Sequence, residues 1–181
     1  VFGLRAQNGR VVWGEVLAMP RRIGALPAIA DIRGFPAIDE GRVYAVSHSG
    51  RMVALEERRG GRVWDADIGS INTPAVVGNV IYVITLENEL IAIERATGNI
   101  IWKEVLATRE DPSDHTSDPV LWWGPVVASG KLWVSNSLGS VSAYDAMKGH
   151  EVYHNEDLED AFSLPPIVAG GILYVLSDDG D

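Results

Sequence analysis

One spacing recurs along the chain and restricts its fold more than any other feature. Three times, an aromatic residue is followed by alanine ten positions later and by a second aromatic residue ten positions after that. Self-similarity with a fixed internal spacing is typical of repeat proteins. We therefore expect one small structural unit to occur several times. The three sets are Tyr44, Ala54 and Trp64; Tyr82, Ala92 and Trp102; and Trp133, Ala143 and Tyr153.

A proline precedes the first aromatic residue of each unit by eight positions, and a fourth such pair occurs near the end of the sequence. Successive prolines are 38, 51 and 41 residues apart. This spacing suits a four-stranded antiparallel unit of roughly 40 to 45 residues. Differences in length then fall in the loops between units. The four pairs are Pro36 and Tyr44, Pro74 and Tyr82, Pro125 and Trp133, and Pro166 and Tyr174.

Within one unit, residues 80–85 and 90–93 are short β-branched runs without internal charge, and we expect them to form a hairpin. Both faces of these strands are apolar, as expected for small sheets packed between neighbouring sheets. A second turn at Thr97 and Gly98 leads to an outer strand, whose Trp102 is expected to wedge against the adjacent unit. At the hairpin turn the four units have residues that tolerate positive φ, namely Gly50, Asn88, Gly139 and Gly180.

These features predict an all-β protein, a β-propeller of four-stranded antiparallel blades. We expect three complete blades at residues 14–64, 65–102 and 103–153, with outer strands of a further blade at 1–13 and inner strands of a last one at 154–181. Because both ends fall inside a blade, we expect the chain to be part of a longer protein. An open arc with exposed sheet edges that favour self-association is expected over a closed four-bladed ring, since blade packing sets the angle between blades.

Composition argues against some partners. The net charge of −10 and pI near 4.8 disfavour a nucleic-acid groove, which needs clustered Lys and Arg. The absence of cysteine excludes disulfides, thiol nucleophiles and thiolate-bound metal within these 181 residues. No apolar run in the sequence reaches the length of a membrane span.

Residues capable of chemistry are scattered, and we assign no catalytic, cofactor-binding or metal-binding residue. The four histidines, 48, 115, 150 and 154, are read as surface residues of hairpins and loops. The Ser-His-Ser triplet around His48 falls in a predicted turn, as does the calcium-loop-like run at 177–181. The acidic insertion at 109–119 is a candidate functional loop. Of Trp122 and Trp123, we expect one in the core and one partly exposed.

The stretch from Ala92 to Trp102 is similar to the tryptophan-docking repeat of pyrroloquinoline-quinone-type propellers, which normally have eight blades. The chain would then be about half of such a ring. Residues 30–36, 41–47, 50–55 and 164–176 resemble segments of the BamB family, the propeller lipoproteins of the machinery that inserts β-barrel proteins into the bacterial outer membrane.

This resemblance implies a non-catalytic scaffold without a cofactor. Its parent would be periplasmic and held at the outer membrane by a lipid anchor. In the family, two acids in the loop before this proline help bind the POTRA domains of the barrel-inserting subunit. Asp31 matches the first acid, whereas Arg33 occupies the second position, so only Asp31 is carried over as partner-binding. The structural alternative for Asp31 is an Asx turn that caps the loop before Pro36.

Two other functions stay open from the sequence. A fragment of a quinone-dependent dehydrogenase would need a stacked planar cofactor, a calcium ion and a catalytic base, and we identify no converging set of such residues. A generic propeller that serves as a sensor or adaptor would share the repeat, because a fold does not fix a function.

Overall fold

Strands and turns account for the whole described fold. The computed structural model describes residues 1–17, 34–155, 158 and 160–180, and sixteen strands lie within these residues. None of the described residues belongs to a helix that could cross a membrane. The first sheet contains β1 (Phe2–Leu4) and β2 (Val11–Gly14), and the last contains β15 (Ile167–Ala169) and β16 (Ile172–Tyr174).

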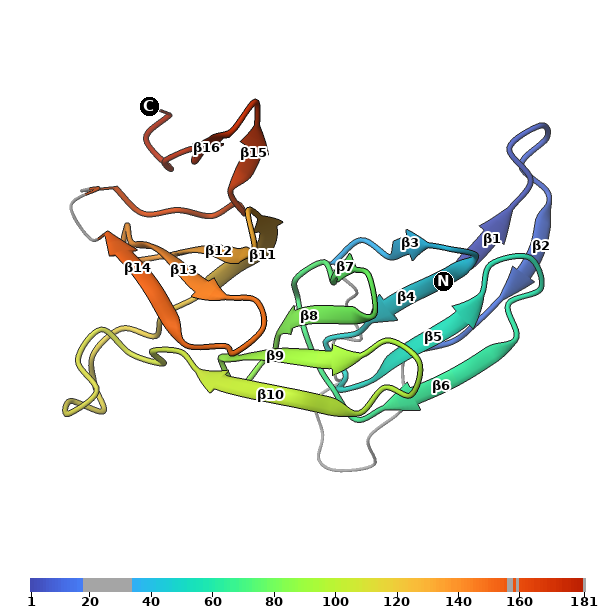
Figure 1. Ribbon diagram of the computed structural model, residues 1–181, viewed down its shortest axis with the longest axis horizontal. Helices are drawn as coiled ribbons and strands as arrows, with labels where there is room; N and C mark the ends of the chain where they lie inside the picture. Colours follow the sequence, from blue (N-terminus) through green and yellow to red (C-terminus); the bar gives the residue numbers. More distant parts are fainter. Residues whose placement is uncertain (18–33, 156–157, 159, 181) are drawn as a thin grey trace.

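Three complete four-stranded sheets lie between these two-stranded ones. Each is antiparallel with its strands in sequence order, and the sheets follow one another along an open arc (Figure 1). The predicted all-β propeller architecture is confirmed. The sheets comprise β3 (Ala37–Asp39), β4 (Arg42–Val46), β5 (Met52–Glu56) and β6 (Arg62–Ala66); β7 (Ala75–Val77), β8 (Val80–Ile84), β9 (Glu89–Glu94) and β10 (Ile100–Val105); and β11 (Trp122–Ala128), β12 (Lys131–Asn136), β13 (Val141–Asp145) and β14 (Glu151–Asn155).

The ten-residue spacing of the sequence is the register of the sheets. In the first complete sheet Ala54 lies opposite Tyr44 on one side and opposite Trp64 on the other. The small alanine lets the two rings approach across it, with ring centroids 6.1 Å apart. The corresponding rings are 6.0 Å apart in the second complete sheet and 5.6 Å apart in the third. Each sheet therefore has an aromatic pair bridged by its third strand.

A β-bulge interrupts the pairing of the third and fourth strands at the same place in each of the four sheets that contain them. The unpaired residue immediately precedes the outer aromatic residue and is an exposed, β-branched side chain. A bulge of this kind bends the strand and increases its twist. The four bulged residues are Val12, Val63, Ile101 and Val152. The outer strands also continue two or three residues past the aromatic positions 64, 102 and 153.

The outer aromatic residue docks onto the next sheet. The indole N–H of Trp64 donates to the Arg95 carbonyl at 2.9 Å, and its ring lies 2.8 Å from the position that a Cβ on Gly98 would occupy. Trp13 repeats this contact one sheet earlier, with an indole bond of 2.7 Å to the Glu57 carbonyl. Glycine is required at the receiving turn because the ring fills the space of a side chain.

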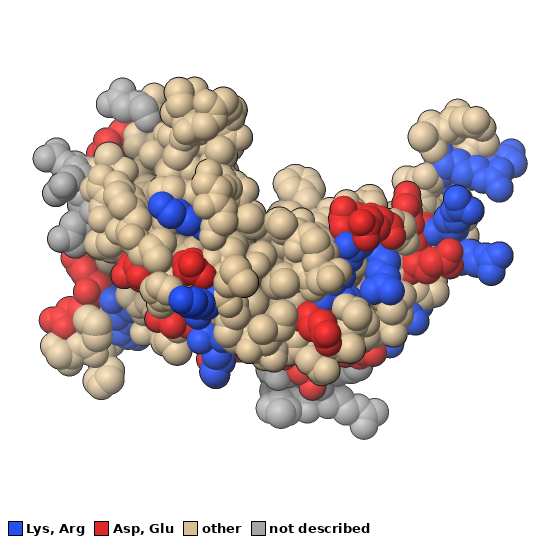
Figure 2. Space-filling view, viewed as in Figure 1, with Lys and Arg blue, Asp and Glu red and all other residues tan. Residues whose placement is uncertain are grey.

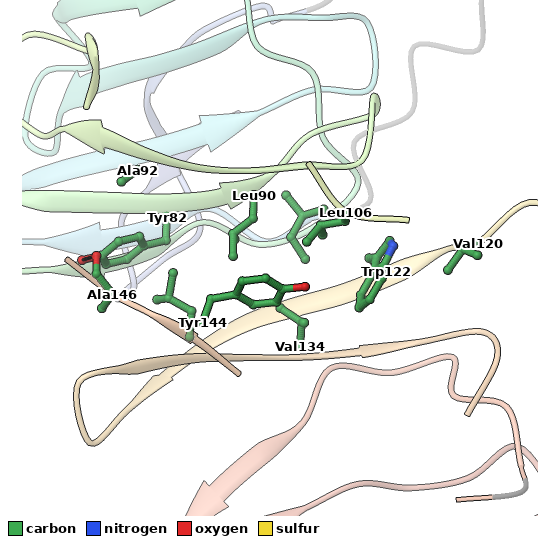
Figure 3. Packing of buried hydrophobic residues seen from close by; sticks show 11 residues of the cluster. Tyr82, Leu90, Ala92, Leu106, Val120, Trp122, Val134, Tyr144 and Ala146 are labelled. Atoms are coloured by element: carbon green, nitrogen blue, oxygen red, sulfur yellow. Dashed lines mark hydrogen bonds between the residues drawn. The ribbon is translucent and has the colours of Figure 1, made fainter. Parts of the chain in front are cut away.

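Hydrophobic clusters fill the spaces between successive sheets. The cluster between the second and third complete sheets contains Tyr82, Leu90, Leu132 and Tyr144 (Figure 3). The Tyr82 hydroxyl crosses this interface and donates to the Ala146 carbonyl at 3.0 Å. Burial raises the pKa of Tyr82 and, more strongly, that of Tyr144. Both phenols therefore stay neutral at physiological pH and pack as core residues.

The predicted turn chemistry is confirmed by backbone angles. The φ angles of Gly50, Asn88, Gly139 and Gly180 are 93°, 57°, 82° and 89°. The second predicted turn also has a left-handed glycine, Gly98, with φ of 81°.

Substitutions at two glycines distinguish the energetic cost of losing the docking contact from the cost of backbone strain. Gly98 and Gly41 have similar φ angles of 81° and 75°, yet only Gly98 has a neighbouring ring within contact distance. Gly41→Ala is expected to lower the free energy of unfolding by about 1–2 kcal/mol, the cost of a left-handed residue with a Cβ. Gly98→Ala must also displace the Trp64 indole and is expected to cost about 3 kcal/mol or more. Urea unfolding of both variants measures the difference, and equal losses would contradict the docking role.

Candidate partner-binding face

The two ends of the strands form two different surfaces. In every complete sheet, the loop before the first strand and the turn between the second and third strands lie at the same end. We call this end the loop face and the opposite end the turn face. The described loop face comprises residues 34–36, 47–51, 67–74, 85–88, 106–121, 137–140, 160–166 and 175–180. The turn face comprises residues 5–10, 40–41, 57–61, 78–79, 95–99, 129–130, 146–150 and 170–171.

The loop face is held together by backbone bonds between its loops and turns. The Leu86 N–H donates to the Gly69 carbonyl and the Ser137 N–H donates to the Leu121 carbonyl, both at 3.0 Å. The same Gly69 forms a parallel bridge with Ser47. The loops that enter the second and third complete sheets are thereby fixed to the turns of those same sheets, and Gly69 also joins the turn of the first complete sheet.

The candidate residue Asp31 lies within 18–33, outside the described residues. The residues that follow it are described and belong to the loop face. Gly34 packs against the backbone of Asn72, and the Phe35 N–H donates to the Thr73 hydroxyl at 2.9 Å. The Phe35 side chain is 79% exposed. The segment that leads out of the candidate site is therefore attached to the neighbouring loop and presents an aromatic ring to solvent.

Beneath this segment, buried Asn72 connects the sheets. Its side-chain amide donates to the Trp122 carbonyl at 3.0 Å, and its carbonyl oxygen accepts from the Gly124 N–H at 3.3 Å. Ser70 accepts from the Asn72 N–H and donates to the Ile84 carbonyl at 2.6 Å. Sequence reasoning missed Asn72, because a buried and an exposed asparagine look alike in a loop sequence.

The acidic insertion at 109–119 forms a projection from the loop face (Figure 1). A bridge between Arg109 and Pro119 closes its base. The carboxylates of Asp111 and Asp114 each accept bonds of 2.7–2.8 Å from the backbone N–H and hydroxyl of the residue two positions later. These bonds lower the pKa of both aspartates. Both carboxylates therefore stay ionised at pH values below the range in which an aspartate ordinarily becomes protonated.

Charge is unevenly divided between the two faces. Counted over the segments that define them, the loop face has nine acidic and two basic residues, whereas the turn face has two acidic and six basic residues. Figure 2 shows Lys and Arg side chains gathered at the β1–β2 end of the arc. A partner with a basic surface is therefore attracted to the loop face and disfavoured at the turn face.

A buried arginine on the turn face was also missed from the sequence. The Arg95 guanidinium donates to the Tyr44 hydroxyl at 2.8 Å and forms ion pairs with Asp39 at 2.8 Å and Glu40 at 3.0 Å. The bond to Tyr44 is the main cause of a raised Arg95 pKa. Arg95 thus joins the first and second complete sheets, and its contacts are those of a structural residue.

The Ser-His-Ser triplet around His48 and the run at 177–180 form hydrogen bonds with nearby polar side chains. The Ser47 hydroxyl bonds to Ser49 at 2.9 Å within the predicted turn around His48. Asp178 accepts a 2.8 Å bond from Ser163. Across the described residues, no group of three or more His, Asp or Glu side chains is arranged to hold a metal ion.

The two adjacent tryptophans have different environments. Trp122 is buried in the cluster between the second and third complete sheets, whereas Trp123 is half-buried. The Trp123 indole donates to the Phe162 carbonyl at 2.7 Å. One core residue and one partly exposed residue were expected from the sequence, and the structure identifies which is which.

Comparisons with known proteins agree with this architecture. The family model described as outer membrane protein assembly factor BamB matches residues 1–104. BamB of Escherichia coli (strain K12) is 25% identical over 180 residues, which cover 99% of this chain and 43% of that protein. BamB from Moraxella catarrhalis aligns in structure with a TM-score of 0.80 and 20% identity, over 98% of this chain and 50% of that one.

A quinohemoprotein alcohol dehydrogenase from Comamonas testosteroni aligns with a TM-score of 0.54 and 19% identity, over 70% of this chain and 21% of that one. At this identity the likeness is one of fold alone. The fold thus defines a β-propeller of docked-tryptophan blades. The chain belongs to the BamB family of outer membrane protein assembly factors. It spans about half the length of the curated relatives that match along all of it.

Removing the Asn72 side chain tests the connection beneath the loop face. Asn72→Ala leaves a buried carbonyl and a buried N–H unpaired, and we expect the free energy of unfolding to fall by about 2 kcal/mol. Asn79→Ala removes an exposed amide and is expected to change it by less than about 0.5 kcal/mol. Urea unfolding of both variants provides the measurement. An Asn72→Ala variant as stable as the Asn79→Ala control would show that the amide does not connect the sheets.

Proposed function

We propose that this chain is the propeller part of a non-catalytic scaffold in outer membrane protein assembly. The observation that carries the proposal is the match to BamB proteins along 99% of the chain. We further propose that it binds the POTRA domains of the barrel-inserting subunit, and that its parent is periplasmic and anchored to the outer membrane by a lipid.

The loop face is the proposed binding surface. Asp31 precedes Phe35, whose exposed ring belongs to this face, and the nine acidic side chains of the face favour a basic partner. Asp31 would form an ion pair or charge-assisted hydrogen bond with that partner. Arg33, two residues later, would require an acidic group nearby on the same partner, a local reversal of the general charge pattern.

Titration of the chain with purified POTRA domains from its own organism tests this function. Calorimetry at physiological salt is expected to give micromolar or tighter binding, and Asp31→Ala to weaken it about tenfold, which equals about 1.4 kcal/mol. The control is Glu57→Ala, which removes an exposed acid from the turn face. Both variants must retain the wild-type melting temperature. Unchanged affinity in Asp31→Ala would reject the role of this residue, and no heat at high concentration would reject the partner.

The dehydrogenase alternative has its own experiment. A quinoprotein would bind pyrroloquinoline quinone with calcium and reduce a dye in the presence of an alcohol. We expect neither an absorbance shift of the quinone nor dye reduction above the level without protein. Calcium-dependent quinone binding together with alcohol-dependent dye reduction would reject the scaffold function in favour of an enzyme.

A further inference from the structure

A polar pocket opens on the turn face between the first and second complete sheets. Its volume is about 350 Å³, at the small end of the range for pockets that bind small molecules. It is surrounded by the β3–β4 turn with the start of β4, by the β7–β8 turn, and by the end of β9 with the turn that follows. The pocket therefore belongs to the junction of two sheets. Its walls are formed by Glu40, Arg42, Asn79, Glu94, Arg95 and Ala96.

Arg95 lines this pocket, but its charge is already balanced within the protein. The Arg95 guanidinium forms ion pairs with the carboxylates of Asp39 and Glu40. It also donates to the Tyr44 hydroxyl and to the carbonyls of Gly78 and Asp39. Arg95 therefore fixes the wall in place and has little capacity left for a ligand.

Two other charged side chains of the pocket have no ionic partner. The partly exposed Arg42 guanidinium makes one hydrogen bond, of 3.3 Å, to the Arg95 carbonyl. The Glu94 carboxylate accepts a bond from the Thr97 hydroxyl. Within the described part of the chain, neither side chain has an oppositely charged group within 4.0 Å, so the two do not pair with each other. One positive and one negative charge thus line the same pocket without being neutralised.

A ligand that carries both charges would match these two side chains together. A guanidinium donates two parallel bonds to a carboxylate, and an ammonium group donates to a carboxylate such as that of Glu94. The side-chain amide of Asn79, which has no hydrogen bond to another described residue, adds one donor group and one acceptor to the wall. A ligand with a single charge would match one of the two side chains and be repelled by the other.

We propose that this pocket binds a small zwitterion, an amino acid or short peptide with free termini, whose carboxylate contacts Arg42 and whose ammonium group contacts Glu94. Arg42 lies at the start of β4 and Glu94 at the end of β9, so the ligand bridges the first and second complete sheets. The pocket is on the turn face, whereas the proposed partner-binding surface is the loop face. This inference therefore does not depend on the proposed function.

The indole N–H of Trp64 is a reporter for this pocket, because it donates to the same Arg95 carbonyl that Arg42 contacts. Titration of the isotope-labelled full chain with glycylglycine is expected to shift the Trp64 indole resonance in nuclear magnetic resonance spectra. We expect a millimolar dissociation constant, because the charged contacts are open to solvent. The indole resonance of Trp13, which donates to Glu57 at another junction, is expected to stay unchanged.

Blocked and shorter ligands test the two charges separately. N-acetylglycylglycine lacks the ammonium group and glycylglycinamide lacks the carboxylate, and we expect each to bind about tenfold more weakly than glycylglycine. Glycine has both charges on a shorter molecule. Comparing its affinity with that of glycylglycine distinguishes a free amino acid from a peptide as the preferred ligand.

Substitutions separate ligand binding from packing of the sheets. Arg42→Met keeps an aliphatic side chain and removes the charge, while the Arg95 carbonyl retains its bond from Trp64. We expect Arg42→Met and Glu94→Gln each to weaken glycylglycine binding about tenfold without lowering the melting temperature. The control is Arg59→Met, which removes an exposed guanidinium of the turn face outside the pocket and is expected to retain the wild-type affinity.

Three results would overturn the proposal. The first is an unchanged Trp64 resonance at about 20 mM glycylglycine, well above the expected dissociation constant. The second is equal affinity for glycylglycine and both of its blocked forms. The third is wild-type affinity in Arg42→Met and Glu94→Gln. If Arg42→Met does not fold, the affinity of Glu94→Gln alone decides the third result.

Discussion

The docking of an outer-strand indole onto a left-handed glycine of the next sheet organises this molecule. A four-stranded sheet of short strands is too small to bury its own faces, so it is stable only when packed against a neighbour. The Trp64 ring packs into the space above Gly98 of the neighbouring sheet. The hydrogen bond from the Trp64 indole to the Arg95 carbonyl fixes the orientation of that ring. Because Trp64 also packs on Tyr44 within its own sheet, a single side chain links the register inside one blade to the position of the next. The same contact therefore determines both strand pairing and blade packing.

Much of the fold could be predicted from the sequence, because the features that specify it are local. The ten-residue spacing fixes which residues lie opposite one another, and positive φ at Asn88 requires one of few residue types. Contacts between distant residues were not predictable in the same way. Asn72 and Arg95 are polar residues in or beside loops, and only the packing of separate sheets makes them buried. Asp31 was identified by resemblance, and it stays a prediction because it lies outside the described residues.

The two ends of the strands differ in what they offer a partner. At the turn face, short and similar turns receive the docked indoles, so their residues serve packing within the protein. At the loop face, the connections vary in length and carry most of the acidic side chains, and they are free to diverge without disturbing the register. Buried polar bonds such as those of Asn72 hold these loops at defined positions. The loop face thus combines loops held in place by buried bonds with a surface whose side chains can vary independently of the fold.

The bulges in the outer strands affect how readily the outer edge of each sheet could pair with a strand of another molecule. At each bulge, an extra residue such as Ile101 increases the twist of the outer strand and exposes an apolar side chain at the outer edge of the sheet. A twisted, bulged outer strand is a poor template for another strand, so edge-to-edge pairing of the outer strands with another chain is disfavoured.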